Sequence, residues 1–302
     1  MRHSPPQPMT PGSRPKPTSP PPTPVGSEPQ AKAAWDPGTQ AVVRNTLAKG
    51  SQQLGLDLSD AQIDALMAYL GLLHKWSKVY NLTAVRDPLE MVTLHLLDSL
   101  AVVPALLRHL ATPHLPTTER HAPTGPGDSD NTSPSLTTTS GSGSAPTSPS
   151  PAAPSEVTPA PSLRLLDVGS GAGLPGVVIA IACPHIQVTC IDAVAKKAAF
   201  VQQVAASLGL AHLRGLHQRI EQLDTPHDVV CSRAFASLAD FVHGSANALA
   251  PGGTWLALKG KTPTEELSAL GPEVAVFHVE QLQVPGLDAQ RCLVWMRPSI
   301  TP

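Results

Sequence analysis

The stretch LRLLDVGSGAGLPG, residues 163–176, decides the fold of this 302-residue chain. Its first six residues form a short apolar run that is typical of a buried strand. Four glycines then fall within eight residues, and an apolar segment up to Ala182 predicts a helix. A strand, a glycine-rich turn and a helix in this order indicate a nucleotide-binding loop. Glycines let a ligand approach the backbone, and the helix start offers unpaired N–H groups.

Two acidic residues narrow the ligand that this loop is expected to bind. A carboxylate at Asp167, just before the first glycine, would repel a dinucleotide pyrophosphate and attract an ammonium group, such as that of S-adenosylmethionine. Asp192 ends the next predicted strand, where an acid can accept hydrogen bonds from both ribose hydroxyls. We therefore predict an adenosylmethionine site that includes Gly169, Gly171 and Asp192. Two structural explanations stay open: a tight strand–helix junction for the loop, and a helix N-cap for Asp192.

The segment after the loop alternates between predicted strands and helices. Seven strands are expected, at residues 163–168, 187–192, 213–217, 228–234, 254–259, 274–283 and 291–296. Helices are expected at residues 174–182, 195–208, 238–249 and, weakly, 264–270, with a turn at 251–253. This alternation predicts an α/β fold with a mostly parallel sheet and helices on both faces. The short connection between the last two strands predicts that they are antiparallel.

The chain is expected to have four parts. Residues 1–35 are rich in Pro, Ser and Thr and predict a disordered tail, because they offer little apolar surface to bury. Residues 36–110 predict a small helical domain, with helix starts marked by the capping box Ser59–Gln62 and by Asp87 before Pro88. Residues 111–161 are again of low complexity and predict a surface insertion. Residues 162–299 then form the α/β domain.

Composition limits the function classes. The formal net charge of −2 gives no overall basic signal for nucleic acid, so RNA binding would need a local basic stripe. Lys75, Lys78 and Arg86 are either an ordinary helix end and loop or such a basic surface. The four cysteines are widely spaced and form no metal-ligand or disulfide pattern. With no continuous apolar run of membrane-spanning length and no signal peptide, we expect a cytoplasmic protein without a metal.

Six separated motifs resemble those of the bacterial ribosomal RNA small subunit methyltransferase G family, also called glucose-inhibited division protein B. They are LHKW (73–76) with YNLT (80–83), DS (98–99), DVGSGAGLPG (167–176), SRAFA (232–236), LKG (258–260) and VP (284–285). The resemblance covers about residues 47–110 and 163–296. It implies a class I, Rossmann-like methyltransferase that uses S-adenosylmethionine to methylate guanine N7 in the decoding-region loop of 16S rRNA. The partner implied is the small ribosomal subunit or its assembly intermediate.

The resemblance also assigns roles to individual residues. It implies that the cofactor is contacted by Gly169 and Leu174, with the adenine beside Ile220 and Glu221 and the ligand beside Arg233. It implies that RNA phosphates are contacted by Arg219, Lys259 and Arg291. The two low-complexity segments depart from the family pattern.

The target atom explains why no catalytic acid or base is predicted. Guanine N7 has an in-plane lone pair and no proton to lose, so the transfer needs only in-line placement. The Asn/Asp-Pro-Pro-aromatic tetrapeptide that suits exocyclic amines is absent after the fourth strand, where Arg233 stands instead. Arg233 is able to orient a base edge or a phosphate. A salt bridge with a neighbouring carboxylate is its structural alternative.

Three other functions stay open. Cys231 would be the thiolate nucleophile of a cytosine-C5 methyltransferase, although its apolar strand favours a buried structural cysteine. A nicotinamide-dependent oxidoreductase would use a similar loop, although Asp167 opposes it. A non-catalytic RNA-binding protein would keep the fold without the chemistry.

Overall fold

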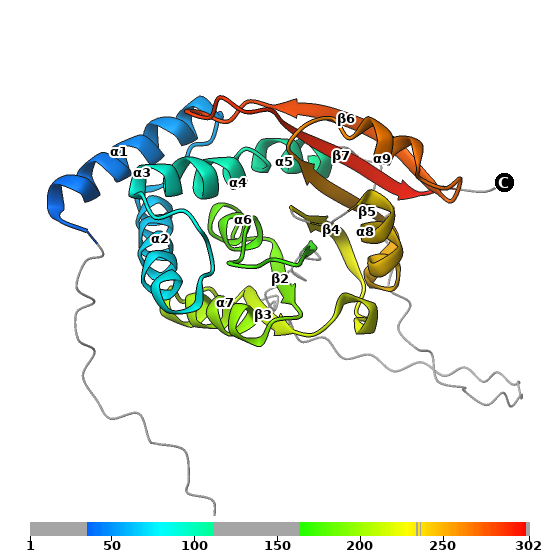
Figure 1. Ribbon diagram of the computed structural model, residues 1–302, viewed down its shortest axis with the longest axis horizontal. Helices are drawn as coiled ribbons and strands as arrows, with labels where there is room; N and C mark the ends of the chain where they lie inside the picture. Colours follow the sequence, from blue (N-terminus) through cyan, green and yellow to red (C-terminus); the bar gives the residue numbers. More distant parts are fainter. Residues whose placement is uncertain (1–34, 112–162, 234, 236, 300–302) are drawn as a thin grey trace, which may run out of the picture. The chain divides into compact units, whose positions relative to one another are not determined.

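A seven-stranded sheet forms the centre of the fold, with strand order β3-β2-β1-β4-β5-β7-β6 (Figure 1). The structure is a computed structural model that describes residues 35–111, 163–233, 235 and 237–299. The strands are β1 (Arg164–Val168), β2 (Gln187–Asp192), β3 (Leu213–His217), β4 (His227–Ser232), β5 (Leu249–Lys259), β6 (Val274–Leu282) and β7 (Arg291–Pro298). The predicted tail and insertion lie almost wholly outside the described residues.

The pairing of the strands confirms the predicted topology. Strands β1 to β5 run parallel to one another, whereas β7 is antiparallel to both β5 and β6. The chain starts in the middle of the sheet at β1, runs outward to β3, and then crosses back to β4 on the other side of β1. The strand order therefore reverses between β1 and β4, which is where open α/β sheets bind their ligands.

The predicted turn at residues 251–253 is wrong, because these residues lie inside β5. The register between β4 and β5 shifts between His227 and Val229, and Gly252 has φ 74°. A bulge of this kind adds residues to one strand without ending it. The expected strand at 254–259 is therefore longer than the sequence pattern indicates.

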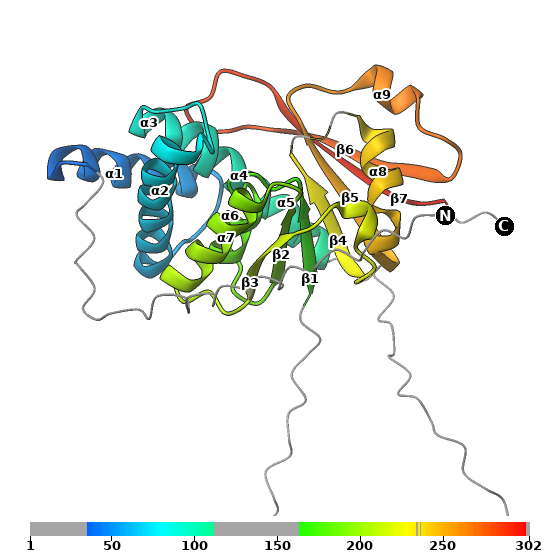
Figure 2. The same ribbon diagram turned by 60° about the horizontal axis from the view of Figure 1, so that its bottom comes forward.

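Helices cover both faces of the sheet, as predicted (Figure 2). Alternate side chains of β1 point to opposite faces, so Leu165 belongs to one hydrophobic cluster and Leu166 to the other. The helices α6 (Gly176–Ala182) and α7 (Ala195–Ser207) lie on the first face. The second face is covered by α8 (Leu238–Ser245) and the 3₁₀ helices Ile220–Gln222 and Ala246–Ala248. The short helix α9 (Thr264–Ser268) contacts α8.

The helical segment before the sheet packs against α6 and α7 and shares their hydrophobic cluster. Its elements are α1 (Pro37–Gln53), α2 (Asp60–Tyr80), α3 (Pro88–Met91), the π-helical turn η1 (Val92–Leu97), α4 (Asp98–Leu100) and α5 (Val103–Ala111). Both predicted helix starts are confirmed. Ser59 and Gln62 form a complete capping box, and the Asp87 carboxylate accepts the N–H groups of Leu89 and Glu90.

One stretch of the described chain, Pro88–Ala111, is long and apolar enough to cross a bilayer by composition alone. Within the protein, however, 72% of its most apolar 18-residue window is buried. Leu96, Leu100 and Leu106 are fully covered by the neighbouring helices and sheet. This burial is what a core helix of a folded domain shows, and it accounts for the apolar composition.

Candidate active site at the carboxyl edge of the sheet

The glycine-rich loop joins β1 to α6 at the carboxyl edge of the sheet. The N–H groups of Gly169 and Ser170 both donate to the carbonyl oxygen of Ile191, at 2.9 and 3.1 Å, and so hold the loop against β2. Gly169 is exposed and has φ 65°, and a Cβ built on it meets no atom within 4 Å. This open backbone suits the close approach of a ligand.

Gly173, two residues before Pro175, serves packing instead. Its φ is 84°, and a Cβ built there would lie 2.3 Å from Cγ2 of Val177. Leu174, which the sequence places at the cofactor, is 5% exposed and belongs to the hydrophobic cluster under the loop. Helix α6 starts at Gly176 and not at Leu174, because the loop takes up the first residues of the predicted helix.

Asp167 lies under the loop and does not face an open ligand site. The residue is fully buried, and its Oδ2 accepts the N–H of Gly176 at 2.8 Å at the start of α6. Burial raises the pKa of this carboxyl to about 7, against the opposing effects of the Gly176 N–H and the Arg233 charge. The geometry therefore gives Asp167 a structural role at the start of α6, and its attraction to a ligand ammonium stays a prediction.

Asp192 lies beside the loop, as predicted for an acid at the end of the second strand. Its Oδ2 accepts the N–H of Gly171 at 3.0 Å, and its Oδ1 accepts the N–H of Val194 at 2.8 Å. The Nζ of Lys197 lies 3.6 Å from the same carboxylate, and the Asp192 side chain is 7% exposed. The fold thus brings together two predicted site residues, Gly171 and Asp192, that are 21 positions apart. The helix N-cap that was its structural alternative is wrong, because α7 has Val194 as its N-cap residue and no side-chain capping hydrogen bond.

Ile220 and Glu221 follow β3 at the same edge. Strand β3 pairs with β2 so that His217 is opposite Asp192, which puts the next residues of the chain close to the predicted ribose site. Ile220 is 7% exposed and packs in the second hydrophobic cluster, whereas Glu221 is exposed. An apolar wall with a polar neighbour is a suitable surface for a purine ring and its edge.

Arg233 follows β4 at the point where the strand order reverses. The preceding Ser232 donates its hydroxyl to the carbonyl of Val168 at 2.9 Å, which joins the end of β4 to the end of β1. Arg233 therefore stands next to the glycine loop. Its Nη1 lies 3.2 Å from Oδ2 of Asp98 and 3.3 Å from the carbonyl oxygen of Leu94. The salt bridge given as its structural alternative is present.

Helix α2 braces the loop through Tyr69, which no sequence motif marked, and it contacts the end of α6 through Gln62. The buried Tyr69 hydroxyl donates to the carbonyl of Ala172 at 2.7 Å. Gln62 of the capping box also donates to the last carbonyls of α6, at Ile181 and Ala182, both at 3.0 Å. Tyr69 lies three residues after Leu66 on the apolar face of α2. A tyrosine hydroxyl on that face needs a buried hydrogen-bond partner, and this is the signal in the sequence that could have predicted the contact.

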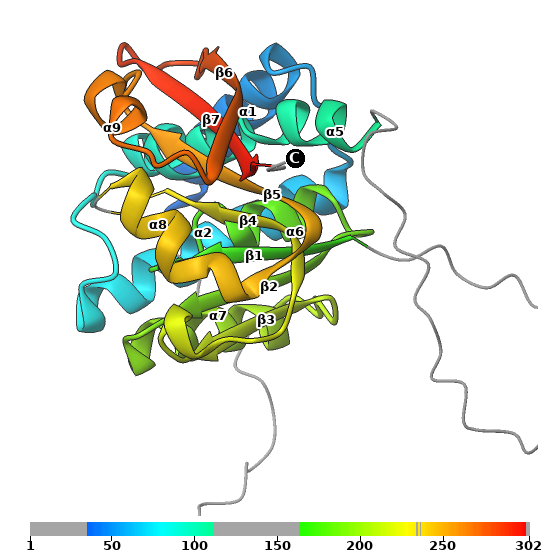
Figure 3. The same cartoon turned by 90° about the vertical axis from the view of Figure 1, so that its right-hand side faces the viewer.

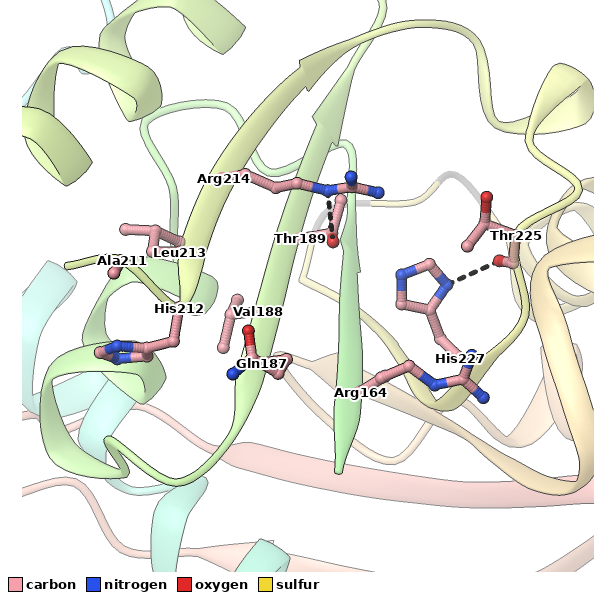
Figure 4. Close-up of a pocket in the computed structure, with 10 residues that line it drawn as sticks. All are labelled: Arg164, Gln187, Val188, Thr189, Ala211, His212, Leu213, Arg214, Thr225 and His227. Atoms are coloured by element: carbon pink, nitrogen blue, oxygen red, sulfur yellow. Dashed lines mark hydrogen bonds between the residues drawn. The ribbon is translucent and has the colours of Figure 1, made fainter. Parts of the chain in front are cut away.

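A separate cleft of about 340 Å³ lies at the opposite, amino edge of the sheet (Figure 4). Its wall includes Arg164 and His227, the first residues of β1 and β4, together with Arg214 of β3. Arg164 is paired with Asp228, and Arg214 donates to Thr189 at 3.2 Å. The predicted site residues gather at the carboxyl edge, so this cleft lies away from the predicted cofactor site.

Comparison with known proteins decides the family. The model of the family described as rRNA small subunit methyltransferase G matches residues 62–111 and 153–294. The chain belongs to this family. A protein from Acidovorax sp. (strain JS42) named ribosomal RNA small subunit methyltransferase G is 52% identical over 263 residues, which cover 85% of this chain and 99% of that relative. A protein of the same name from Polaromonas naphthalenivorans (strain CJ2) is 52% identical over 260 residues, covering 86% and 98%.

Solved structures are also similar to part of the chain. One of them is a SAM-dependent methyltransferase from Geobacter sulfurreducens in complex with S-adenosyl-L-homocysteine, with 15% sequence identity and a TM-score of 0.36. The similarity covers 46% of this chain and 86% of that protein.

As a member of the methyltransferase G family, the chain is an S-adenosylmethionine-dependent methyltransferase. The carboxyl edge fits this cofactor. Gly169 leaves its backbone open, and Asp192 presents a carboxylate beside it. Within the described residues, no group of three or more His, Cys, Asp or Glu side chains is arranged to hold a metal ion.

The three residues predicted to face RNA phosphates lie in different environments. Arg219 is exposed at the start of the 3₁₀ helix Ile220–Gln222. Lys259, at the end of β5, lies 2.7 Å from Oε2 of Glu266 and is 15% exposed. Arg291, at the start of β7, donates through Nε to Asp98 at 2.7 Å. All three lie at the carboxyl edge, but only Arg219 is fully presented to solvent.

Cys231 lies in the interior of β4, as the structural alternative expected. It is fully buried, and burial together with the nearby Asp167 carboxylate raises the pKa of its thiol well above the ordinary value. A nucleophilic cysteine needs the opposite conditions, which are partial exposure and a lowered pKa. The environment of Cys231 therefore disfavours the cytosine-C5 alternative.

Proposed function

We propose that this chain transfers the methyl group of S-adenosylmethionine to N7 of a guanine in the decoding-region loop of 16S rRNA. The support is membership of the methyltransferase G family, combined with the gathering of Gly169, Asp192 and Arg233 at the strand-order reversal. The relatives' name supplies the class of substrate, the RNA of the small ribosomal subunit. The guanine and its N7 atom are the finer part of this proposal.

The chemistry requires positioning more than proton transfer. When bound, S-adenosylmethionine supplies an electrophilic methyl group on a sulfonium. Guanine N7 attacks through its in-plane lone pair, so that an N–C bond forms and the C–S bond breaks with its electrons left on sulfur. Because N7 carries no proton, the residues of the chain have only to align the two reactants.

Three residues carry this alignment in the proposal. The open backbone at Gly169 lets the cofactor approach the end of β1. Asp192 accepts hydrogen bonds from ribose hydroxyls through the lone pairs that its bonds to the N–H groups of Gly171 and Val194 leave free. Arg233 donates to an acceptor on the ligand and orients it. No residue is assigned as an acid or a base.

We place this activity in the cytoplasm, on the small subunit or an intermediate of its assembly. The family's substrate class is the reason for this location. The burial of Pro88–Ala111 agrees with this location, because most of that apolar segment packs in the protein core.

The test is rRNA from cells that lack this chain. Borohydride and aniline cleave RNA at N7-methylguanine, and primer extension then locates the cut. We expect one cleavage signal in the decoding region to disappear and to return when the wild-type chain is supplied. Persistence of every signal in the deleted strain would overturn the proposal.

A matched pair of variants links that signal to the loop. Gly171→Leu places a side chain at a position with φ 58° beside Asp192, whereas Gly209→Leu makes the same change at φ 64° on the exposed end of α7. We expect Gly209→Leu to restore the signal and Gly171→Leu to fail. A Gly171→Leu protein that folds and restores full methylation would count against the loop as the cofactor site.

A further inference from the structure

One buried carboxylate connects three segments that are far apart in the sequence. Asp98 of α4 has a side chain that is 7% exposed. Its Oδ1 accepts Nε of Arg291 at 2.7 Å, and its Oδ2 accepts Nη1 of Arg233 at 3.2 Å. The two arginines are 135 and 193 residues away from it along the chain. This arrangement holds two guanidinium groups next to a single carboxylate.

The charges of this group do not balance. One carboxylate faces two guanidinium groups, so the three residues carry a net charge of +1. Asp167, whose pKa the Arg233 charge lowers, is fully buried under the loop and accepts the N–H of Gly176. The side chains of Arg233 and Arg291 are 27% and 26% exposed, so both keep contact with solvent.

These contacts use only part of the hydrogen-bond donors of Arg233 and Arg291. A guanidinium has five N–H groups. The hydrogen bonds of Arg233 run from Nη1 to Asp98 and to the carbonyl of Leu94. Those of Arg291 run from Nε to Asp98 and from Nη1 to the carbonyl of Gln290. Paired donors that remain on two adjacent guanidinium groups match the oxygens of a carboxylate or a phosphate.

Both arginines stand at the edge where the proposed reaction takes place. Arg233 directly follows β4, whose end is joined to the end of β1 through Ser232. Arg291 precedes Cys292, which is opposite Lys259 at the end of β5. Asp98 reaches this edge from the helical segment, whereas Arg291 begins β7, which lies beside β5 in the sheet (Figure 3).

We propose that Asp98 is a positioning residue that holds Arg233 and Arg291 together as a receptor for one oxyanion at this edge. The oxyanion is either the carboxylate of S-adenosylmethionine or a phosphate of the substrate RNA. Asp98 acts through the two arginines and does not touch the reacting atoms. This inference rests on the function proposed above.

Asp98→Asn tests the positioning role, with Asp60→Asn as the matched control. Asparagine keeps the size and one acceptor oxygen, but it turns an amide donor toward one of the arginines. Asp60 makes the control suitable because it is also ion-paired with an arginine, Arg44, yet its side chain is 99% exposed. For Asp98→Asn we expect at least a tenfold lower kcat/KM on small subunits from cells lacking this chain, and for Asp60→Asn no change.

The measured constants distinguish the two sources of the oxyanion. If the receptor holds the cofactor carboxylate, Asp98→Asn weakens S-adenosylmethionine binding in calorimetry and leaves the KM for small subunits unchanged. If it holds an RNA phosphate, the KM for small subunits rises, its dependence on salt becomes weaker, and cofactor affinity stays the same. Either result supports the proposal.

A double-mutant cycle separates positioning from simple stabilisation. If Asp98 acts partly through Arg291, the double variant Asp98→Asn/Arg291→Gln loses less activity than the sum of the two single losses, because Asp98 then has only Arg233 left to position. Fully additive losses, or an Asp98→Asn protein with a lower Tm but unchanged kcat and KM, would overturn the role. Should Asp98→Asn not fold, Arg291→Lys takes its place, since it keeps the charge and loses the guanidinium fork. Unchanged activity of Arg291→Lys would then overturn the proposal.

Failure of the oxyanion-receptor proposal can be distinguished from failure of the proposed function. If the wild-type protein binds S-adenosylmethionine but methylates no small-subunit RNA, the function proposal fails. The calorimetric comparison of wild type with Asp98→Asn still reports whether the arginines form a carboxylate receptor.

Discussion

The hydroxyl of Tyr69 donates a 2.7 Å hydrogen bond to the carbonyl oxygen of Ala172, and this contact ties helix α2 to the glycine-rich loop. Both residues are buried, and the Tyr69 ring lies 6.3 Å from the ring of Phe200. Burial raises the pKa of the Tyr69 hydroxyl well above its ordinary value, so it stays a donor. The helical segment is thus part of the structural support of the cofactor loop.

Tyr69→Phe tests this brace. The ring and its packing remain, but the Ala172 carbonyl loses its buried partner, which costs about 1–2 kcal/mol of unfolding free energy. We expect urea denaturation to show this loss and calorimetry to show weaker S-adenosylmethionine binding. Tyr80→Phe is the control, because Tyr80 is 39% exposed. Equal effects of the two changes would contradict a specific brace.

Gly169→Ala and Gly173→Ala separate backbone strain from steric conflict. Both positions have positive φ, so each alanine costs about 1–2 kcal/mol from the left-handed conformation alone. Only at Gly173 does the new methyl group meet Val177, at 2.3 Å. We therefore expect Gly173→Ala to lower the free energy of unfolding further, by about 1–3 kcal/mol. Thermal denaturation that ranks the two variants equally would show that the loop relaxes.

Asp167 predicts a specific dependence of stability on pH. Its folded-state pKa of about 7 lies above the ordinary value of 3.8, so the folded protein keeps a proton that the unfolded chain releases. The stability from this group is fully present below about pH 4 and is lost as the pH rises to about 7. A shift of this size corresponds to at most about 4 kcal/mol.

Asp167→Asn removes this titration and keeps an oxygen for the Gly176 N–H. We expect the unfolding free energy of wild type, measured relative to Asp167→Asn, to decrease between pH 4 and pH 8. Denaturant titrations at a series of pH values measure the difference. A difference that stays constant with pH would show that Asp167 titrates at its ordinary value in the folded protein.

Arg219 and Lys259 differ in how readily they reach an RNA phosphate. Arg219 is exposed, so Arg219→Gln should lower the salt dependence of small-subunit binding by about 1 in the slope of log K against log salt. Lys259 is paired with Glu266, so Lys259→Gln should change the slope less unless the RNA breaks that pair. Binding isotherms at several salt concentrations measure both slopes. An unchanged slope for Arg219→Gln would remove that residue from the RNA interface.

Cys231→Ala distinguishes N7 transfer from thiolate chemistry. Because the thiol is buried and its pKa is raised, we expect kcat on small subunits to stay within a few-fold of wild type. The protein should lose about 1 kcal/mol or more of stability, as for other truncations in a core. A folded Cys231→Ala protein without methyltransferase activity would revive the cytosine-C5 mechanism.

The sequence alone predicted the order of elements and the edge of the sheet at which we propose the site. Residues 163–176 predict a strand, a loop and a helix, because apolar periodicity and glycine spacing are local properties of the chain. Asp192 was found for the same reason, since an acid at a strand end is visible in the pattern. The positions of helix starts at Asp60 and Pro88 also follow from local capping residues.

Only the tertiary structure decided what those residues touch. It buries Asp167 under the loop, pairs Asp192 with Gly171, and brings Asp98 between Arg233 and Arg291. It also extends β5 through 251–253, where a bulge replaces the expected turn. These outcomes depend on strand register and on packing between segments, and the two Asp98 contacts join residues 135 and 193 positions apart. Such long-range contacts leave no periodic trace in the sequence, and therefore no local pattern predicts them.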